Sequence, residues 1–289
     1  MRIARWLPAL LILVVSSCGS PHTTRTNVDQ FVNWPNQFDN FRFHWYAAAG
    51  VDLTAGPAVA IRAYVESYNL AIISGDSETT LYPGFLEATP VNLPQKAGTP
   101  IELTSVRPDP HPLPASADNA KEGSKQEYFG YQPSYLLSLE KADDTYHAIV
   151  CEGDYATYKR DETRPGKYRS LIASPETGAL QFGDWQSVSV RRIELTERPP
   201  HDTDVLVSQQ GPVPAPQSNV FGRWFISAAS GSLWGPSGHG VRVATPELQQ
   251  QCLDHMPDDA TARQAIATGF HDQPPPHGQP IPGWPAKSR

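Results

Sequence analysis

The sequence predicts an α+β fold in which an amphipathic helix packs on a curved antiparallel sheet. Residues 56–76 carry apolar side chains at helical spacing, whereas residues 131–195 hold short segments in which apolar and polar side chains alternate. A helix followed by antiparallel strands is typical of α+β domains, because the sheet must bury one face and the helix can cover it. Proline-rich loops and short C-terminal helices complete the predicted architecture.

The domain is predicted to begin with a strand in the aromatic-rich segment 31–53. Within it, Arg42 and His44 alternate with three aromatic residues, namely Phe41, Phe43 and Trp45. This alternation is typical of a strand that buries one face. We therefore expect these rings to lie in the core and not to form an exposed binding platform.

The helix is predicted over residues 56–76, which read GPAVAIRAYVESYNLAIISGD. Pro57 suits the first helical position, where no N–H is needed, and Gly75 suits a left-handed cap. One face carries an apolar stripe whose residues are our candidates for lining a ligand pocket: Ile61, Tyr64, Val65, Tyr68 and Ile72. The opposite face carries Arg62, Glu66 and Asn69, and the periodicity predicts that it points away from the sheet.

The remaining elements are predicted from alternation and turn residues. The strands are expected at 134–141 and 145–151, which form a hairpin, and at 168–173, 185–195 and 219–234, with a bulge near Arg191-Arg192. Two short helices are expected at 246–255 and 258–268. Residues 88–127 are predicted to be an inserted proline-rich loop. Residues 31–272 would form a single domain, followed by a disordered proline-rich tail at 273–289.

The N-terminus has the features of an export signal. Arg2 and Arg5 precede an apolar run of nine residues, Leu7 to Val15, which is too short for the about 20 residues that cross a bilayer. A basic start, a short apolar run and small residues are typical of secretory signal peptides. We therefore expect residues 1–17 to be removed and residues 18–30 to form a tether.

The stretch Val15-Ser16-Ser17-Cys18 resembles the lipobox of bacterial prolipoproteins. This resemblance implies that Cys18 is acylated and becomes the first residue of a mature lipoprotein, held on the extracytoplasmic face of the cell membrane. The alternative is an ordinary cleaved signal in which Cys18 plays no part. The excess of arginine over lysine, 16 to 7, is similar to the composition of actinobacterial proteins.

The charge of the chain excludes some partners. Without Arg2 and Arg5, 21 lysines and arginines face 30 acidic residues, a net charge of -9. Nucleic-acid binding depends on neutralising phosphates, so we expect no nucleic-acid partner. An acidic surface also argues against attachment to anionic lipid through charge, which leaves the lipid on Cys18 as the expected membrane contact.

Two cysteines remain besides Cys18, namely Cys151 and Cys252. In an oxidising compartment a single disulfide between them is expected, although the sequence also allows two separate buried thiols.

The stretch AIRAYVESYNLAIISGD resembles the first helix of the NTF2-like, or cystatin-like, cone-shaped fold. The resemblance covers residues 57–198 at most, and the proline-rich stretch 88–127 departs from that pattern. It implies a pocket between the helix and the inner face of the sheet. No catalytic pair of the enzymatic members can be placed on this sequence.

No assembled catalytic or metal site emerges from the motifs. Gly75-Asp76-Ser77 resembles the nucleophile block of GDSL-type hydrolases, but no Asp-x-x-His block lies near the C-terminus. Ser237 sits in a glycine-rich stretch that lacks the G-x-S-x-G pattern. The histidines lack metal-ligand spacing, so neither a metal nor another cofactor is expected.

Three functions stay open at this point. The leading hypothesis is a membrane-anchored, non-catalytic binding module of the cell envelope, with a small apolar or amphipathic ligand or an envelope protein as partner. The alternative is a secreted serine hydrolase that uses Ser77 or Ser237. The third is a structural accessory subunit without a pocket.

Overall fold

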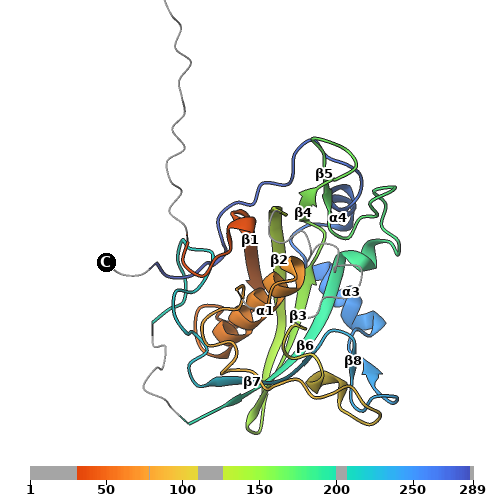
Figure 1. Cartoon of the computed structure of the whole chain (residues 1–289). Helices are drawn as coiled ribbons and strands as arrows, with labels where there is room; N and C mark the ends of the chain where they lie inside the picture. Colours follow the sequence, from red (N-terminus) through yellow and green to blue (C-terminus); the bar gives the residue numbers. More distant parts are fainter. Residues whose placement is uncertain (1–30, 78, 110–125, 200–206, 287–289) are drawn as a thin grey trace, which may run out of the picture. The chain divides into compact units, whose positions relative to one another are not determined.

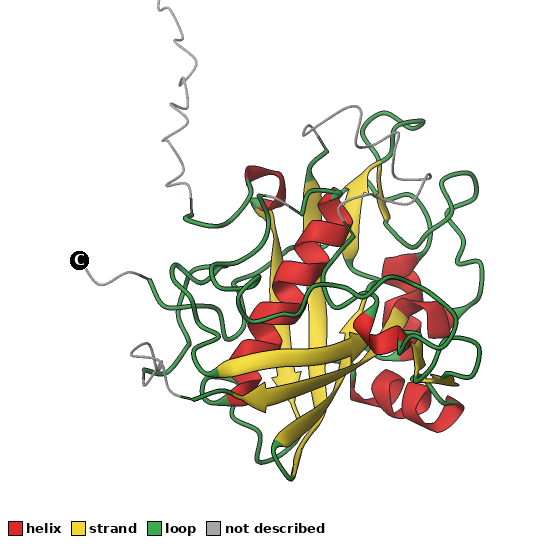
Figure 2. Cartoon of the chain, turned by 60° about the horizontal axis from the view of Figure 1, so that its bottom comes forward, coloured by secondary structure: helices red, strands yellow, loops and turns green. Residues whose placement is uncertain are grey.

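A strongly curled sheet carries one long helix, α1, across its inner face (Figures 1 and 2). The computed structural model describes residues 31–77, 79–109, 126–199 and 207–286, which belong to one compact unit that runs from Phe31 to Arg289. Helices and strands are mixed, so the predicted α+β class is confirmed. Cys18, the predicted signal 1–17 and the tether 18–30 lie outside the described residues.

The described sheet has seven strands in the order β5-β4-β2-β3-β6-β7, with β1 paired to β2. Their bounds are β1 (Asn40–Ala47), β2 (Tyr128–Ala142), β3 (Thr145–Gly153), β4 (Thr157–Arg160), β5 (Tyr168–Ser170), β6 (Val188–Glu197) and β7 (Trp224–Ser230). A separate pair is formed by β8 (Leu233–Trp234) and β9 (Val241–Arg242). The helices are α1 (Pro57–Ser74), α3 (Pro246–His255) and α4 (Ala260–Ala267), and the short 3-10 turns are η1 (Asn36–Phe38), η2 (Ile101–Leu103) and η3 (Asp184–Ser187).

Strand β2 is the longest strand and it joins both halves of the sheet. Its first half pairs with β1 in parallel and with β4, and its second half forms the predicted hairpin with β3. Gly130 on β2 has a φ of 85°, and a Cβ there would lie 2.2 Å from the carbonyl oxygen of Ala156. Only glycine therefore allows β2 and the start of β4 to approach so closely.

Helix α1 confirms the predicted bounds and caps. Pro57 occupies the first turn, and Gly75 ends the helix in the left-handed region with a φ of 68°. The burial of its faces, however, differs from the prediction. The polar face, Arg62, Glu66 and Asn69, is buried, whereas Ile72 of the apolar stripe is 52% exposed.

The polar face of α1 is buried because a second layer of residues, which helical periodicity cannot predict, covers the helix. The sheet packs on one side of the helix, and residues from loops and from the C-terminal region pack on the other. These residues include Tyr82, Phe85, Val106, Val213, Phe221 and Trp284, which belong to the same core cluster as the α1 side chains. A helix enclosed on both sides must satisfy its polar side chains internally.

The C-terminal residues correct another prediction. Residues 273–286, here called the C-terminal strap, pack on the domain although their proline content predicted disorder. The strap hydrogen-bonds to β1 between the Trp45 N–H and the Ile281 carbonyl, 2.7 Å apart, and Trp284 is 1% exposed. One large aromatic side chain thus anchors a segment whose prolines prevent regular structure of its own.

The strap meets α1 at Glu66. The carboxyl of Glu66 accepts hydrogen bonds from Trp45 Nε1 and Trp284 Nε1, each at 2.8 Å, and from the Tyr82 hydroxyl at 3.1 Å. Arg62, one turn earlier, donates to the Gly283 carbonyl and lies 4.2 Å from the ring centre of Trp284. Burial raises the pKa of Glu66 to about 7. We call this group the closed cluster.

The other face of the sheet packs on α3 and α4. Cys151 of β3 and Cys252 of α3 form the predicted disulfide, with their Cα atoms 5.3 Å apart. Both helices begin with side-chain caps, since Thr245 Oγ1 and Asp259 Oδ1 accept hydrogen bonds from Leu248 N and Ala262 N. The predicted bulge near Arg191-Arg192 is wrong in position, because the register of β6 against β7 shifts between Glu194 and Leu195.

Candidate functional site

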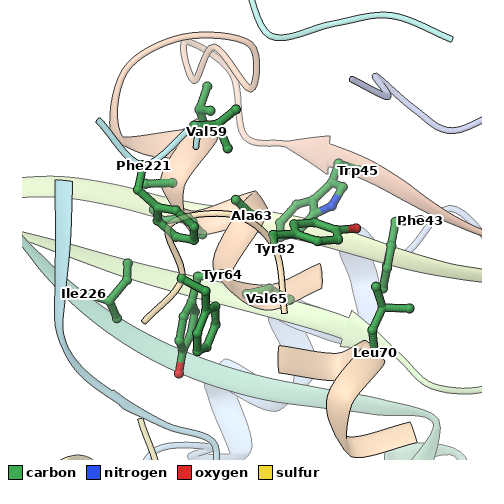
Figure 3. Packing of buried hydrophobic residues seen from close by; sticks show 14 of the residues in the cluster. Phe43, Trp45, Val59, Ala63, Tyr64, Val65, Leu70, Tyr82, Phe221 and Ile226 are labelled. Carbon is green, nitrogen blue, oxygen red and sulfur yellow. The ribbon is translucent and has the colours of Figure 1, made fainter. Parts of the chain in front are cut away.

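The five predicted pocket residues separate into two groups. Ile61, Tyr64 and Val65 are fully buried in the core, and Tyr64 stacks on Phe85 with ring centres 5.6 Å apart. Figure 3 shows Tyr64 and Val65 among other buried side chains of this core. All three residues face packed side chains, so their assignment to a pocket is corrected here. Tyr68 and Ile72, one and two turns later, do line a cavity.

This cavity lies between the C-terminal half of α1 and the sheet, and it has a volume of about 310 Å³. Its apolar wall is formed by Ile72 and Ile73 of α1 and by Leu171 and Ile172 after β5. Its polar wall is formed by side chains from α1, β2, β3, β4 and β6 and from the β3–β4 turn. The size is at the lower end of the about 300–1,000 Å³ typical of small-molecule sites.

Asn69 and Glu152 stand at the centre of the polar wall. Arg191 Nε donates to Glu152 Oε1 at 2.6 Å, and Asn69 Nδ2 donates to Glu152 Oε2 at 2.6 Å. Asn69 also donates to Gln132 Oε1 at 3.1 Å, and Gln132 Nε2 donates to Asp154 Oδ1 at 2.9 Å. A continuous chain of hydrogen bonds thus runs along the cavity from Arg191 to Asp154, and each bond restricts the next side chain.

The two carboxyl groups in this series of hydrogen bonds differ in how their charges are compensated. Burial alone would lower the pKa of Arg191, but Glu152 outweighs it and holds that pKa above its usual value. Arg191 and Glu152 therefore form a neutral pair. Burial, together with the charge of Glu152, raises the pKa of Asp154 to about 7. Among the described residues, no lysine, arginine or histidine lies within ion-pair distance of Asp154.

Thr157 adds an unsatisfied group to the same wall. The residue is 2% exposed, it lines the cavity, and its Oγ1 has no hydrogen-bond partner. A buried hydroxyl without a partner costs about 1–3 kcal/mol. A molecule in the cavity with a hydrogen-bonding group would remove that cost.

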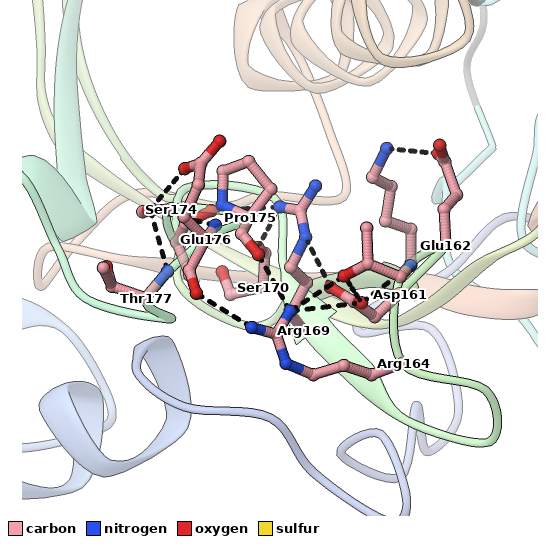
Figure 4. Close-up of polar contacts among 12 residues, drawn as sticks. Asp161, Glu162, Arg164, Arg169, Ser170, Ser174, Pro175, Glu176 and Thr177 are labelled. Carbon is pink, nitrogen blue, oxygen red and sulfur yellow. Dashed lines mark hydrogen bonds and ion pairs between the residues drawn. The ribbon is translucent and has the colours of Figure 1, made fainter.

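The loop that supplies Leu171 and Ile172 is held by two arginines (Figure 4). Arg169 lies 3.3 Å from Asp161 Oδ2 and donates to the Ala173 carbonyl, and Arg164 donates to the carbonyls of Pro175 and Glu176. These bonds tie the loop to the end of β4, so the apolar wall is fixed in place. Preorganised walls are typical of ligand sites.

A larger hollow of about 710 Å³ lies at the surface beside residues 81–92. Its one cationic side chain, Arg107, donates to the carbonyls of Leu86 and Thr89 and to Thr89 Oγ1. Because that guanidinium serves to hold the loop, the hollow offers less polar recognition than the smaller cavity. We therefore take the cavity under α1 as the candidate site.

The two candidate nucleophiles lie in different parts of the domain. Ser77 follows α1 and borders the larger hollow, and Ser237 lies between β8 and β9. Within the described part of the chain, neither side chain hydrogen-bonds to a histidine. His147 bonds to Glu194 and His44 to the His277 carbonyl, so these rings have other partners.

The described residues lack two further features. No group of three or more histidine, cysteine, aspartate or glutamate side chains is arranged to hold a metal ion. Over the same residues, no helix combines the length and the hydropathy that crossing a bilayer requires.

Sequence reasoning missed most of the polar wall, namely Asn69, Gln132, Glu152, Asp154, Thr157, Ser189 and Arg191. Two of these residues did have a signal. Glu152 lies two and four positions after the buried Val150 and Ala148, and Arg191 lies two positions before the buried Ile193, so both share the inner face of the sheet with these residues. Opposite charges on the inner face of neighbouring strands indicate a buried pair.

Comparison of the chain with family models, with curated proteins and with solved structures found no match.

Proposed function

We propose that the chain is a lipid-anchored, non-catalytic binding protein of the cell envelope, which holds a small molecule in the cavity under α1. The proposal rests on one observation, the hydrogen-bonded wall that ends in Asp154 and in the unpartnered hydroxyl of Thr157. Buried polar groups normally have partners, and a wall that lacks one at a cavity is suited to a ligand.

The cavity favours this function over the two others. A purely structural subunit has no need of a cavity lined by so many polar side chains. A serine hydrolase needs a base beside its nucleophile, and among the described contacts no histidine hydrogen-bonds to the hydroxyl of Ser77 or Ser237. The cavity is lined by both apolar and polar side chains, which suits an amphipathic molecule with one hydrogen-bonding end.

The proposed location rests on Cys18 and on the disulfide. Acyl chains on Cys18 would hold the protein on the membrane, since each buried methylene contributes about 0.8 kcal/mol. The Cys151–Cys252 disulfide supports an oxidising compartment, because such bonds persist outside the cytosol. The membrane contact would therefore be the lipid, and the described domain would project from the extracytoplasmic face.

Native mass spectrometry of the full chain, purified from its own membrane, tests both parts of the proposal. We expect an added acyl mass that Cys18→Ser abolishes, and a second, non-covalent mass that corresponds to a bound ligand. Ile72→Trp should fill the mouth of the cavity and remove that ligand. Val241→Trp, which places the same side chain at a 67% exposed position elsewhere, should retain it.

Two results would contradict the proposal. A mature chain recovered from the medium without added lipid would reject the anchor. Equal ligand content in Ile72→Trp and Val241→Trp would reject the cavity under α1 as the binding site.

A further inference from the structure

Resting on the proposed binding function, we infer that the cavity selects a small aliphatic amine, bound as its ammonium ion between Asp154 and Thr157. The inference names a ligand class that neither the fold nor the motifs indicate. It follows from the charges, the hydrogen-bond partners and the shape of the cavity.

The polar wall contains two carboxyl groups. Glu152 is 2% exposed, and its charge is neutralised by Arg191, which donates two hydrogen bonds to it with lengths of 2.6 and 3.4 Å. Asp154, the other carboxyl of the wall, forms no ion pair in the described structure, and the charge of Arg191 lowers its pKa by less than burial and Glu152 raise it. A ligand that carries a carboxylate or a phosphate would add a second negative charge beside it, whereas an ammonium group would supply the missing cation.

The hydrogen-bond partners of the polar wall also favour an ammonium ion. Gln132 donates to Asp154 Oδ1, and Ser189 bonds to the same carboxyl, whose two oxygens can accept about four hydrogen bonds when ionised. Thr157 Oγ1 has no hydrogen-bond partner. Two oxygen acceptors on the same wall match the N–H groups of a primary ammonium, which has three donors and no acceptor.

The cavity also has an apolar lining. Ile72, Ile73, Leu171 and Ile172 line it together with Asp154. An alkyl group of a few carbons would lie against them, with about 25 cal/mol gained for each Å² of apolar area removed from water. A free inorganic cation would leave this apolar surface unused.

The protonation of the site agrees with this reading. The charged or titratable side chains that share the cavity with Asp154 are Glu152 on β3, Arg191 on β6 and Tyr68 on α1. Burial and the charge of Glu152 raise the pKa of Asp154 to about 7. An amine with a pKa of about 10 is charged at every pH from 5 to 8, so a change of its affinity in that range would follow the ionisation of Asp154.

The test uses four probes with the same hexyl chain, namely hexylamine, hexyltrimethylammonium, 1-hexanol and hexanoate. Their binding to the full chain in a neutral detergent is measured by titration calorimetry between pH 6 and 8. We expect hexylamine to bind at least about tenfold more tightly than hexanol, and hexanoate to bind most weakly. The affinity for hexylamine should rise about tenfold from pH 6 to 8 as Asp154 ionises, whereas the affinity for hexanol should stay the same. The quaternary probe should bind less tightly than hexylamine because it lacks N–H donors.

Two variants and a matched control locate the interaction. Asp154→Asn should reduce the affinity for hexylamine at least about tenfold and abolish its pH dependence, while the affinity for hexanol stays within about threefold. Thr157→Val should weaken hexylamine by a smaller factor. Asp144→Asn makes the same substitution in the exposed hairpin turn and should change nothing. Thermal unfolding of each variant verifies that it is folded.

The possible results separate this inference from the proposed function. Hexanol or hexanoate binding as tightly as hexylamine, with Ile72→Trp blocking all of them, would overturn the amine while the cavity remains a binding site. Hexylamine binding that Asp154→Asn leaves intact would overturn the assigned site. If no probe binds at millimolar concentration the amine inference fails, whereas the ligand recovered with the native protein still decides the proposed function.

Discussion

Glu66 and Asp154 have the same altered acidity in different surroundings. Burial raises the pKa of each carboxyl to about 7. Glu66 is fully enclosed and accepts hydrogen bonds from two indoles and a phenol, whereas Asp154 borders a cavity beside an unpartnered hydroxyl. The comparison teaches that a shifted pKa does not by itself identify a site. The space next to the carboxyl distinguishes a group that holds the fold together from one that is available to a ligand.

The largest expected effect comes from opening the closed cluster. Trp284→Ala should lower the free energy of unfolding by about 3–5 kcal/mol, because it removes a buried indole and a donor to Glu66. Urea denaturation measures this change. Phe182→Ala is the control, since that ring is 52% exposed and its loss should cost about 0.5 kcal/mol or less. A small loss for Trp284→Ala would show that the C-terminal strap is not part of the core.

The second effect is the pH dependence of the closed cluster. Because the folded pKa of Glu66 lies above its usual value of 4.5, its contribution is fully present below pH 4.5 and is lost as the pH rises through 7. The expected loss is about 3 kcal/mol at 1.36 kcal/mol for each pKa unit.

Glu66→Gln should remove the part of the pH dependence of the free energy of unfolding that Glu66 contributes, whether the substitution stabilises or destabilises the protein. The measurement is a series of urea titrations between pH 4 and 8 on both proteins. Equal slopes would mean that Glu66 does not carry the pH dependence.

The third prediction contrasts Asp154 with Glu66. Asp154→Asn should raise the free energy of unfolding at pH 8 by about 1 kcal/mol, because the amide does not have to ionise in a buried position. The gain is smaller than the full pKa shift would give, because solvent that reaches an open cavity screens the charge of the carboxylate. The new Oδ1 can still accept from Gln132. A loss of stability comparable to that of Trp284→Ala would instead make Asp154 a structural residue.

The smallest effect tests the mouth of the cavity. Ile72→Ala should change the free energy of unfolding by no more than about 0.5 kcal/mol, because the side chain is half exposed. Ile61→Ala is the matched substitution on the same helix, and full burial should make it cost about 2–5 kcal/mol. If both substitutions cost the same, Ile72 is part of the core and the cavity is closed at that point.

Much of the fold could be predicted because local patterns determine it. Alternation located the hairpin of β2 and β3, and Pro57 and Gly75 fixed both ends of α1. The burial of Glu66 could not be predicted, because helical periodicity contrasts two faces and cannot show that loops cover the second one. The high proline content of residues 273–286 likewise predicted disorder. The composition of a segment does not show that one aromatic side chain, Trp284, is buried and anchors it.

The candidate site was less predictable than the fold. Tyr68 and Ile72 were found because they belong to the apolar stripe of α1, but the same stripe supplied three core residues. Glu152 and Arg191 could have been paired from the alternation in their strands. Asp154 could not, because it follows the last residue of β3, where no periodicity applies and only the turn places its side chain.

The position of Trp284 has a consequence for how the protein is made. Its indole bonds to Glu66 across 218 positions of the chain, and ribosomes deliver the helix long before they deliver the tryptophan. Until residue 284 arrives, an acidic group and two aromatic rings lack the partner that completes their enclosure. The nascent chain would therefore stay incompletely folded, and would need protection from aggregation, over most of its synthesis.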